Sequence, residues 1–296
     1  MKRTKIISMG EVLWDLFPDG ERFGGASANF ACHCAILGAE VTMVSAVGND
    51  ERGLEAIGIL GDFGIDTSLM QTVPASPTGT VGVRTDGLGK PQFTIHENSA
   101  WDQLAWTPRL AARVSESDAV YFGTLGQRGR SSRATIQRAL DAAESAGVLR
   151  ILDINLRPPF FDQQLIRESI GRASILKLSD DEFNTVAQTC GVPSEVEHLP
   201  GLRTILQQFE LDSIVMTRGA EGALFVSAEG EVEQPGVPTK VIDTVGAGDS
   251  FTAAFVLGLL GGEHTQSLLK NACQTASEVC SKPGAIPIPV AATAAK

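Results

Sequence analysis

The chain has 296 residues, of which 43% are hydrophobic, so it is long enough to bury a large core in one domain. Its 35 acidic residues outnumber 24 basic ones, and the formal net charge of −11 disfavours nonspecific attraction to nucleic acid or anionic membranes. A small, neutral ligand suits this charge better.

The N-terminal segment fits a first β-strand better than a signal peptide, because Ser8, Gly10, Glu11 and Asp15 interrupt its apolar run. Elsewhere the longest apolar run is about ten residues, too short to span a bilayer. The five cysteines lack the spacing of a zinc finger and fit reduced thiols. We therefore expect a cytoplasmic protein.

The sequence GGASAN at residues 24–29 places two glycines before a predicted helix that covers about residues 26–37. This pattern can be a tight turn with a helix cap and nothing more. Alternatively, Gly24 and Gly25 let a polyol lie against the backbone, while the Asn29 amide binds its hydroxyls as donor and acceptor. Asp15 would accept hydrogen bonds from the same hydroxyls.

The same helix carries the run Cys32-His33-Cys34, which invites interpretation as a metal site. Residues two apart on a helix point to nearly opposite faces, so the two thiols cannot share one ion unless the helix unwinds. We interpret the cysteines as small apolar core residues.

Short β-rich runs alternate with helical stretches along most of the chain. Further helices are expected near residues 51–63 and 131–146, and strands near 5–13, 41–48, 119–124, 149–156, 174–179 and 212–219. The alternation predicts parallel strands joined by crossover helices, hence an open α/β sheet. Ligands then gather at the carboxyl ends of the strands.

Two segments, about residues 12–23 and about 71–98, interrupt this alternation. In the second, TVGVRT and QFTIHE flank the turn-forming DGLGKP, which predicts hairpin strands outside the main sheet. We expect a small β-sheet lid inserted in a single domain of residues 1–296, with an exposed apolar face that can serve as a homodimer contact.

The most informative motif is DTVGAGDSF at residues 243–251, a glycine-rich turn before an apolar helix. Free N–H groups at a helix start bind anions, and glycines let a phosphate approach closely. A carboxylate repels phosphate, so Asp249 suggests a second role, accepting a proton from a hydroxyl that attacks the phosphate. The alternative is that Asp249 only caps the helix.

Together, GGASAN and DTVGAGDSF resemble the two signatures of the PfkB, or ribokinase-like, family of carbohydrate kinases, and the whole chain is most similar to bacterial fructokinases. The resemblance implies a Rossmann-like core with a β lid, ATP with Mg²⁺, and a monovalent cation such as K⁺ near Asp243. It implies that Asp249 is the catalytic base. It also implies an anion hole from the backbone of Gly246, Ala247 and Gly248, and sugar contacts from Asp15, Gly24, Gly25 and Asn29.

The resemblance extends to DINLRPPF at residues 153–160, which matches the DxNxR pattern of fructokinase-like members. Arg157 offers a fork of donors for phosphate oxygens and Asn155 can bridge phosphate or water, although a surface ion pair is the usual role of such an arginine. Glu182 would organise Mg²⁺ through water, with Ser179 where many relatives have asparagine. Positions that resemble nucleotide-binding residues are Asn155, Lys177, Thr217, Gly219, Gly222, Asn271 and Gly284.

In the lid, Glu97 is a candidate for choosing among sugars, whereas His96, Trp101 and Trp106 suit packing. The sequence contains no GxxxxGK[ST] phosphate loop, no protein-kinase HRD or DFG pattern and no GxGxxG. The sequence therefore lacks the fingerprints of P-loop enzymes, protein kinases and nicotinamide-dependent dehydrogenases.

We predict an ATP-dependent kinase of a free sugar, with D-fructose as acceptor and fructose 6-phosphate as product. The nearest alternatives are 2-keto-3-deoxygluconate, ribose, tagatose 6-phosphate or a nucleoside as acceptor. An acidic or phosphorylated sugar would need a cation from the lid, chiefly Arg22 or Arg84, which favours a neutral hexose. A catalytically silent sugar-binding regulator is the alternative from another class, and Asp249 with its glycine turn argues against it.

Overall fold

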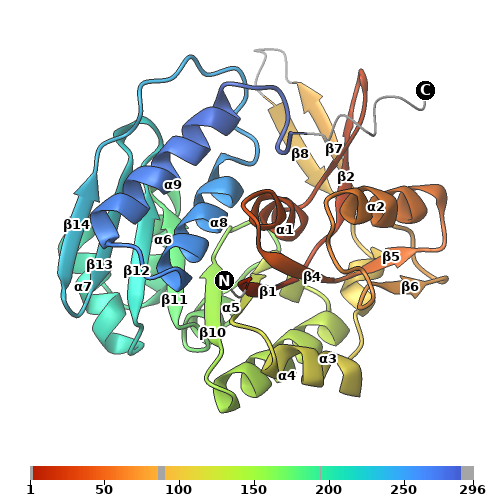
Figure 1. Cartoon of the computed structure of the whole chain (residues 1–296), viewed down its shortest axis with the longest axis horizontal. Coiled ribbons are helices and arrows are strands. Elements are labelled where there is room, and N and C mark those ends of the chain that lie inside the picture. Colours follow the sequence, from red (N-terminus) through yellow and green to blue (C-terminus); the bar gives the residue numbers. More distant parts are fainter. Residues whose placement is uncertain (1–2, 86–90, 194, 288–296) are drawn as a thin grey trace.

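An eight-stranded sheet with strand order β14-β13-β12-β11-β10-β9-β1-β4 forms the centre of the molecule. The structure is a computed structural model that describes residues 3–85, 91–193 and 195–287 (Figure 1). The six strands β4, β1, β9, β10, β11 and β12 run parallel to one another. Strands β13 and β14 follow antiparallel at the β12 edge. The strands are β1 (Lys5–Met9), β4 (Glu40–Val44), β9 (Ala119–Gly123), β10 (Leu149–Asp153), β11 (Ile175–Ser179), β12 (Ser213–Thr217), β13 (Ala223–Ser227) and β14 (Gly230–Gln234).

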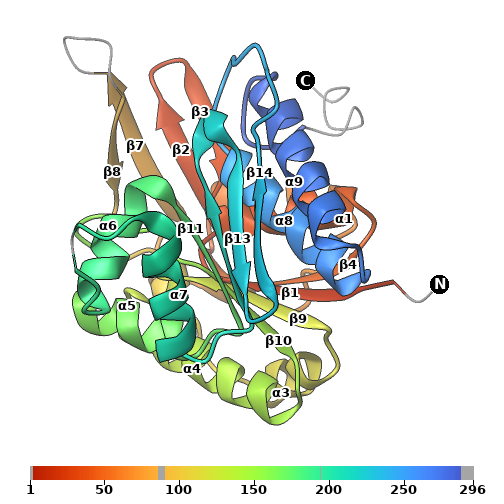
Figure 2. The same ribbon diagram turned by 90° about the vertical axis from the view of Figure 1, so that its left-hand side faces the viewer.

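Helices cover both faces of this sheet, which is why its inner strands are mostly apolar along their length. In β9, Phe122 packs into a core on the side of α3 to α7, while Tyr121 packs into a second core with α1, α2, α8 and α9. The two views in Figures 1 and 2 show these layers. The helices are α1 (Ala26–Ile36), α2 (Glu51–Asp62), α3 (Pro108–Ser115), α4 (Arg130–Ser145), α5 (Gln163–Ile170), α6 (Asp180–Thr189), α7 (His198–Gln208), α8 (Ala247–Leu260) and α9 (Thr265–Cys280).

A second sheet has the order β3-β2-β7-β8 and projects beyond the core (Figure 2). Its strands are β2 (Leu13–Phe17), β3 (Gly20–Gly24), β7 (Gly79–Thr85) and β8 (Pro91–Ile95). These strands come from the two segments that we expected to form a lid. The expected lid segment also contains β6 (Gln71–Val73), but β6 pairs with β5 (Ala46–Gly48) in a separate small sheet. Residues 86–90 of the expected turn lie outside the described residues.

The element pattern agrees with the predicted α/β class, a Rossmann-like open, mostly parallel sheet. Expected helices 26–37, 51–63 and 131–146 correspond to α1, α2 and α4 within one or two residues. Short 3₁₀ helices η1 (Ala100–Gln103), η2 (Leu125–Gln127) and η3 (Gly219–Glu221) lie in connections. Within the described ranges, no helix is long and apolar enough to cross a membrane.

Candidate active site

Two helix starts meet at the side chain of Asp249. Asp249 is the third residue of α8, and Asn29 lies in the first turn of α1. Asn29 Nδ2 donates to Asp249 Oδ2 at 2.8 Å. Asn29 is 4% exposed, and its Oδ1 is buried without a partner among the described residues. A buried acceptor without a partner is free to accept a hydrogen bond from a donor such as a ligand hydroxyl.

The turn before α8 requires glycine. Gly246 has φ 77° and ψ −4°, and a Cβ placed on it would lie 2.4 Å from Ala285 O. Helix α8 begins without a side-chain cap, so Asp249 does not cap its own helix. The first N–H groups of a helix have no partner within the helix, so this uncapped start can receive an anion.

The Asp249 carboxylate has an electrostatic environment that suits a proton acceptor. Burial raises its pKa above the ordinary range, while the hydrogen bond from Asn29 and the positive charges of Lys177 and Arg157 lower it. The balance is a raised pKa. A carboxylate with a raised pKa is a stronger base than an exposed one, which favours general-base chemistry.

A buried ion pair lies next to the start of α8. Lys177 Nζ is 3.1 Å from Asp153 Oδ2, and Thr252 Oγ1 donates to the same carboxylate oxygen at 3.2 Å. Burial raises the pKa of Asp153 to about 6, against the lowering effect of Lys177. A Cβ on Gly248 would lie 3.2 Å from Lys177 Nζ, so this cation borders the backbone of the glycine turn.

Lys177 keeps its positive charge in this setting. Burial opposes the charge, but the carboxylates of Asp153, Glu182 and Asp249 raise the pKa of Lys177. Lys177 matched a nucleotide-contacting position in the sequence, whereas Asp153 and Thr252 were not assigned roles. Asp153 opens the DxNxR motif, so the motif itself was the signal that could have identified it.

Glu11 was also missed, and it holds the GGASAN turn. It is 2% exposed, and it accepts hydrogen bonds from Ala26 N at 3.1 Å and Ser27 Oγ at 3.2 Å. Burial raises the pKa of Glu11, and the charge of Asp249 raises it further. A Cβ on Gly25 would lie 2.7 Å from Glu11 O, so the turn needs glycine there. The signal was a charged residue that interrupts the first apolar strand.

The Asp15 side chain borders Gly24, its diagonal neighbour in the β2–β3 ladder, where Asp15 itself pairs with Arg22. A Cβ on Gly24 would lie 2.8 Å from Asp15 Oδ2. Burial raises the pKa of Asp15 to about 6, while Arg157 and Arg22 lower it. Arg157 is exposed and influences the pKa of Asp15, Glu11 and Asp249. Its charge therefore acts on the lid sheet and on the start of α8 together.

Glu182 is held by backbone and hydroxyl donors. It forms a capping box with Ser179 at the start of α6, accepting from Ser179 N at 2.8 Å and Ser179 Oγ at 2.9 Å. Its other oxygen accepts from Leu156 N at 2.7 Å. These bonds tie α6 to the loop with Asn155, which is half-buried and has φ 39°.

Four of the predicted nucleotide-side residues lie at the turn between β12 and β13 and on α9. Thr217 ends β12, and Gly219 and Gly222, with φ 51° and 94°, form the turn into β13. A Cβ on Gly222 would lie 2.0 Å from Gln234 O, which explains the glycine. On α9, Asn271 Nδ2 donates to Glu263 Oε2 at 2.9 Å.

Asp243 connects the glycine turn to the segment after α9. Its Oδ1 accepts from Val245 N at 3.0 Å, and its Oδ2 accepts from Gly284 N at 2.9 Å. Gly284 has φ 84°. Both carboxylate oxygens thus have backbone partners, and the carboxylate holds two loops together.

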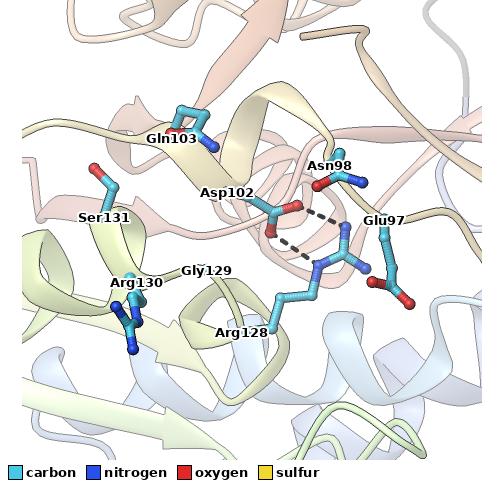
Figure 3. A pocket seen from close by; sticks show the side chains of 8 residues that line it. All are labelled: Glu97, Asn98, Asp102, Gln103, Arg128, Gly129, Arg130 and Ser131. Atoms are coloured by element: carbon cyan, nitrogen blue, oxygen red, sulfur yellow. Dashed lines mark hydrogen bonds and ion pairs between the residues drawn. The ribbon is translucent and has the colours of Figure 1, made fainter.

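Glu97 lies in an open pocket of about 330 Å³ whose lining residues do not include the Asp249 group. Figure 3 shows it beside the guanidinium of Arg128, which makes a bidentate ion pair with Asp102. The Arg128 side chain is 6% exposed, and its guanidinium carbon lies over the Trp101 ring at 4.6 Å and over the Phe160 ring at 4.7 Å. In the part of the chain that the structure describes, Glu97 therefore makes no contact with Asp249 or Asn29.

Comparisons with known proteins point to one family. Residues 17–291 match the family described as pfkB family carbohydrate kinase. Aminoimidazole riboside kinase of Salmonella typhimurium is 28% identical, with 86% of this chain and 81% of the relative covered. Fructokinase of Klebsiella pneumoniae is 29% identical, with 86% and 84% covered, and Fructokinase-2 of Zea mays is 27% identical, with 98% and 92% covered.

Solved structures agree with the fold. A fructokinase with bound ATP from Xylella fastidiosa has a TM-score of 0.83 at 20% identity, covering 96% of this chain and 94% of that one. An uncharacterized sugar kinase from Pyrococcus horikoshii in complex with ATP has a TM-score of 0.80 at 28% identity, with 95% and 93% covered. These likenesses confirm the predicted fold class.

Proposed function

The chain belongs to the pfkB family of carbohydrate kinases and is an ATP-dependent phosphotransferase, and we propose that its acceptor is D-fructose, phosphorylated to fructose 6-phosphate. The observation that carries the proposed site is the 2.8 Å contact between Asn29 Nδ2 and Asp249 Oδ2. It joins the glycine motif near one end of the chain to the glycine turn near the other.

In the proposed reaction, Asp249 accepts the proton of the attacking sugar hydroxyl. The sugar oxygen forms a bond to the γ-phosphorus of ATP, and the bond from that phosphorus to the bridging oxygen breaks and releases ADP. The N–H groups at Gly246, Ala247 and Gly248 receive the charge that develops on the phosphoryl oxygens. Lys177 and Arg157 add positive charge to the same region.

Magnesium fits this site as a partner of ATP. Among the described residues, no cluster of three or more acidic, histidine or cysteine side chains could hold a metal ion alone. Mg²⁺ needs only one or two carboxylates when phosphates and waters supply its other ligands. Glu182 suits an indirect role through water, since its oxygens already accept from Leu156 N and Ser179. Bound Mg²⁺ would neutralise phosphate charge.

The charges around Asp249 support a neutral acceptor. Asp15, Glu11 and Asp249 place carboxyl groups at the two glycine motifs and the lid. Arg22 pairs with Asp19 at 2.9 Å on the surface, and the side chain of Arg84 lies outside the described residues. Of the nearby cations, Lys177 is already paired with Asp153, so these three carboxyl groups favour a neutral sugar over an acidic or phosphorylated one.

A neutral riboside is the second candidate acceptor. Aminoimidazole riboside kinase is among the relatives, at 28% identity. An apolar cluster near the lid would suit a heteroaromatic group. Its members are Leu13, Val81, Trp101 and Leu125, with Ile95 and Phe160 packed against them.

The acceptor is tested with a panel of fructose, ribose, 2-keto-3-deoxygluconate, tagatose 6-phosphate and aminoimidazole riboside. Release of ADP is measured at saturating ATP, and kcat/KM is compared across the panel. Fructose should give the highest value. Equal or better turnover of the keto-deoxy acid, or of the riboside, overturns the choice of fructose.

Two further proposals concern assembly and ions. We propose a homodimer through the lid sheet, where Phe93 is 57% exposed, and light scattering of the purified chain tests it. We also propose that a monovalent cation binds near Asp243, which is tested by comparing activity in potassium and in a bulky organic cation. A monomer, or equal activity in the two salts, contradicts the respective proposal.

A further inference from the structure

His33 lies one helical turn after Asn29 on α1 and is 3% exposed. Its Nε2 is 2.9 Å from Ala285 O. A carbonyl oxygen only accepts hydrogen bonds, so Nε2 carries the proton and donates. Burial lowers the pKa of His33, against the effect of this hydrogen bond, so the ring is neutral at neutral pH. The imidazole therefore makes a specific contact with the segment after α9.

The same carbonyl of Ala285 borders the glycine turn. A Cβ placed on Gly246 would lie 2.4 Å from Ala285 O and 2.7 Å from Ala285 Cα. Gly246 therefore packs directly on the main chain of Ala285. Any shift of Ala285 would change the surface against which the start of α8 is seated.

A second contact joins these two segments. Asp243 accepts from Val245 N within the turn and from Gly284 N next to Ala285. Ala285 is also 8% exposed, so it is packed into the core. The glycine turn and residues 284–285 are thus held as one unit, and His33 attaches this unit to α1.

Helix α1 is consequently linked to the start of α8 by two hydrogen bonds. Asn29 donates to Asp249 directly, and His33 donates to Ala285, on which Gly246 packs. We propose that His33 is a positioning residue that fixes the phosphate-binding turn relative to the acceptor-binding helix. The proposal rests on the roles proposed above for Asn29, Asp249 and Gly246. The proposal also explains why a polar histidine stands between the two buried cysteines of the Cys32-His33-Cys34 run.

The test compares His33→Leu, which keeps a similar volume but has no donor, with His33→Gln, whose amide can still donate to Ala285 O. We expect His33→Leu to lower kcat and raise KM for ATP, with a combined loss of about 10-fold, the usual effect of one lost buried hydrogen bond. KM for the sugar should change less than KM for ATP. His33→Gln should restore most of the loss.

Cys34→Ala is the matched control, since Cys34 is fully buried on the same helix and its loss should lower the melting temperature without changing KM for ATP. Circular dichroism establishes that each variant is folded at the assay temperature. Equal kinetics in the Leu and Gln variants, whether impaired or normal, overturns the role of the hydrogen bond. An effect confined to the sugar KM also overturns it.

Asp249→Asn, assayed in parallel, separates this inference from the proposed function. An inactive Asp249→Asn enzyme with normal His33 variants contradicts only the positioning role. An active Asp249→Asn enzyme contradicts the proposed mechanism itself.

Discussion

The carboxylate of Asp249 accepts a hydrogen bond from the Asn29 amide at 2.8 Å, although the two residues are 220 positions apart in sequence. In this contact the Asn29 Nδ2 group orients the Asp249 carboxylate, and Asn29 Oδ1 stays available to another donor. The pair therefore connects the residue proposed to bind the acceptor with the residue proposed to deprotonate it.

Replacement of Asn29 by alanine should act mainly on the acceptor. The variant loses a buried amide that orients Asp249 and whose Oδ1 can receive a sugar hydroxyl. We expect KM for the sugar to rise by about 10-fold or more, and KM for ATP to change much less. Asn271→Ala is the control, because this exposed amide bonds only Glu263 among the described side chains and should leave the sugar KM unchanged. A change chiefly in KM for ATP for Asn29→Ala would mean that the two sites are interchanged.

Sugar binding should weaken as pH falls through about 6, the pKa to which burial raises Asp15. The ionised carboxylate accepts sugar hydroxyl hydrogen bonds, and protonation removes part of that capacity. The measurement is kcat/KM for the sugar against pH. Asp153 also has a pKa of about 6, so Asp15→Asn is needed for assignment and should flatten the part of the profile that Asp15 causes. A profile unchanged by that variant contradicts the assignment.

Asp15→Asn should also raise the melting temperature at neutral pH. The folded pKa of about 6 lies above the ordinary value of 3.8, so the folded state binds this proton more tightly than the unfolded chain. The resulting stabilisation is complete below about 4 and is lost as pH rises through about 6. Asparagine imitates the neutral form, so its gain should appear at pH 7 and vanish near pH 4. A gain of equal size at both pH values would contradict this explanation.

Gly246→Ala should abolish most of the activity and destabilise the fold. Its φ of 77° disfavours a side chain, and the added Cβ would lie 2.4 Å from Ala285 O. We expect about 100-fold lower kcat, the scale seen when a reacting group is displaced by about 1 Å. Gly58→Ala on the exposed face of α2 is the control, because nothing lies within 4 Å of its added Cβ. It should be neutral or slightly stabilising. Normal turnover in Gly246→Ala would exclude the turn from the site.

Arg128→Ala should destabilise the region under the lid. The Arg128 and Asp102 side chains are 6% and 11% exposed, so removal of one leaves a buried charge without its partner. We expect a loss of about 3–5 kcal/mol in the free energy of unfolding, measured with denaturant. Arg22→Ala breaks an ion pair whose members are 48% and 70% exposed and should cost about 0–1 kcal/mol. Equal losses in the two variants would contradict the importance of burial.

Sequence patterns predicted the elements and residues whose signals are local. The alternation of strands and helices predicted α1, α2 and α4, and the glycine motifs predicted Asn29 and Asp249. A glycine needed for positive φ, such as Gly246, is recognisable because its neighbours already specify a turn before a helix.

Residues whose partners lie far away in the chain were not identified. Glu11, two residues after β1, accepts from Ala26 N at the start of α1, and Thr252 bonds Asp153 across 99 positions. His33 was examined for metal binding, yet its partner is Ala285, 252 positions away. Strand β6 was assigned to the lid because nothing local distinguishes pairing with β5 from pairing with β7. Such choices are decided by tertiary contacts.

The turnover of Asp249→Asn tests the role of Asp249 most directly. Asparagine keeps an oxygen that can accept from Asn29 Nδ2, so the site geometry is preserved while the base is removed. We predict that kcat falls by about 1,000-fold or more, with the dissociation constants for sugar and ATP nearly unchanged. Turnover close to that of the wild-type enzyme in a correctly folded Asp249→Asn variant would contradict the assignment of Asp249 as the catalytic base.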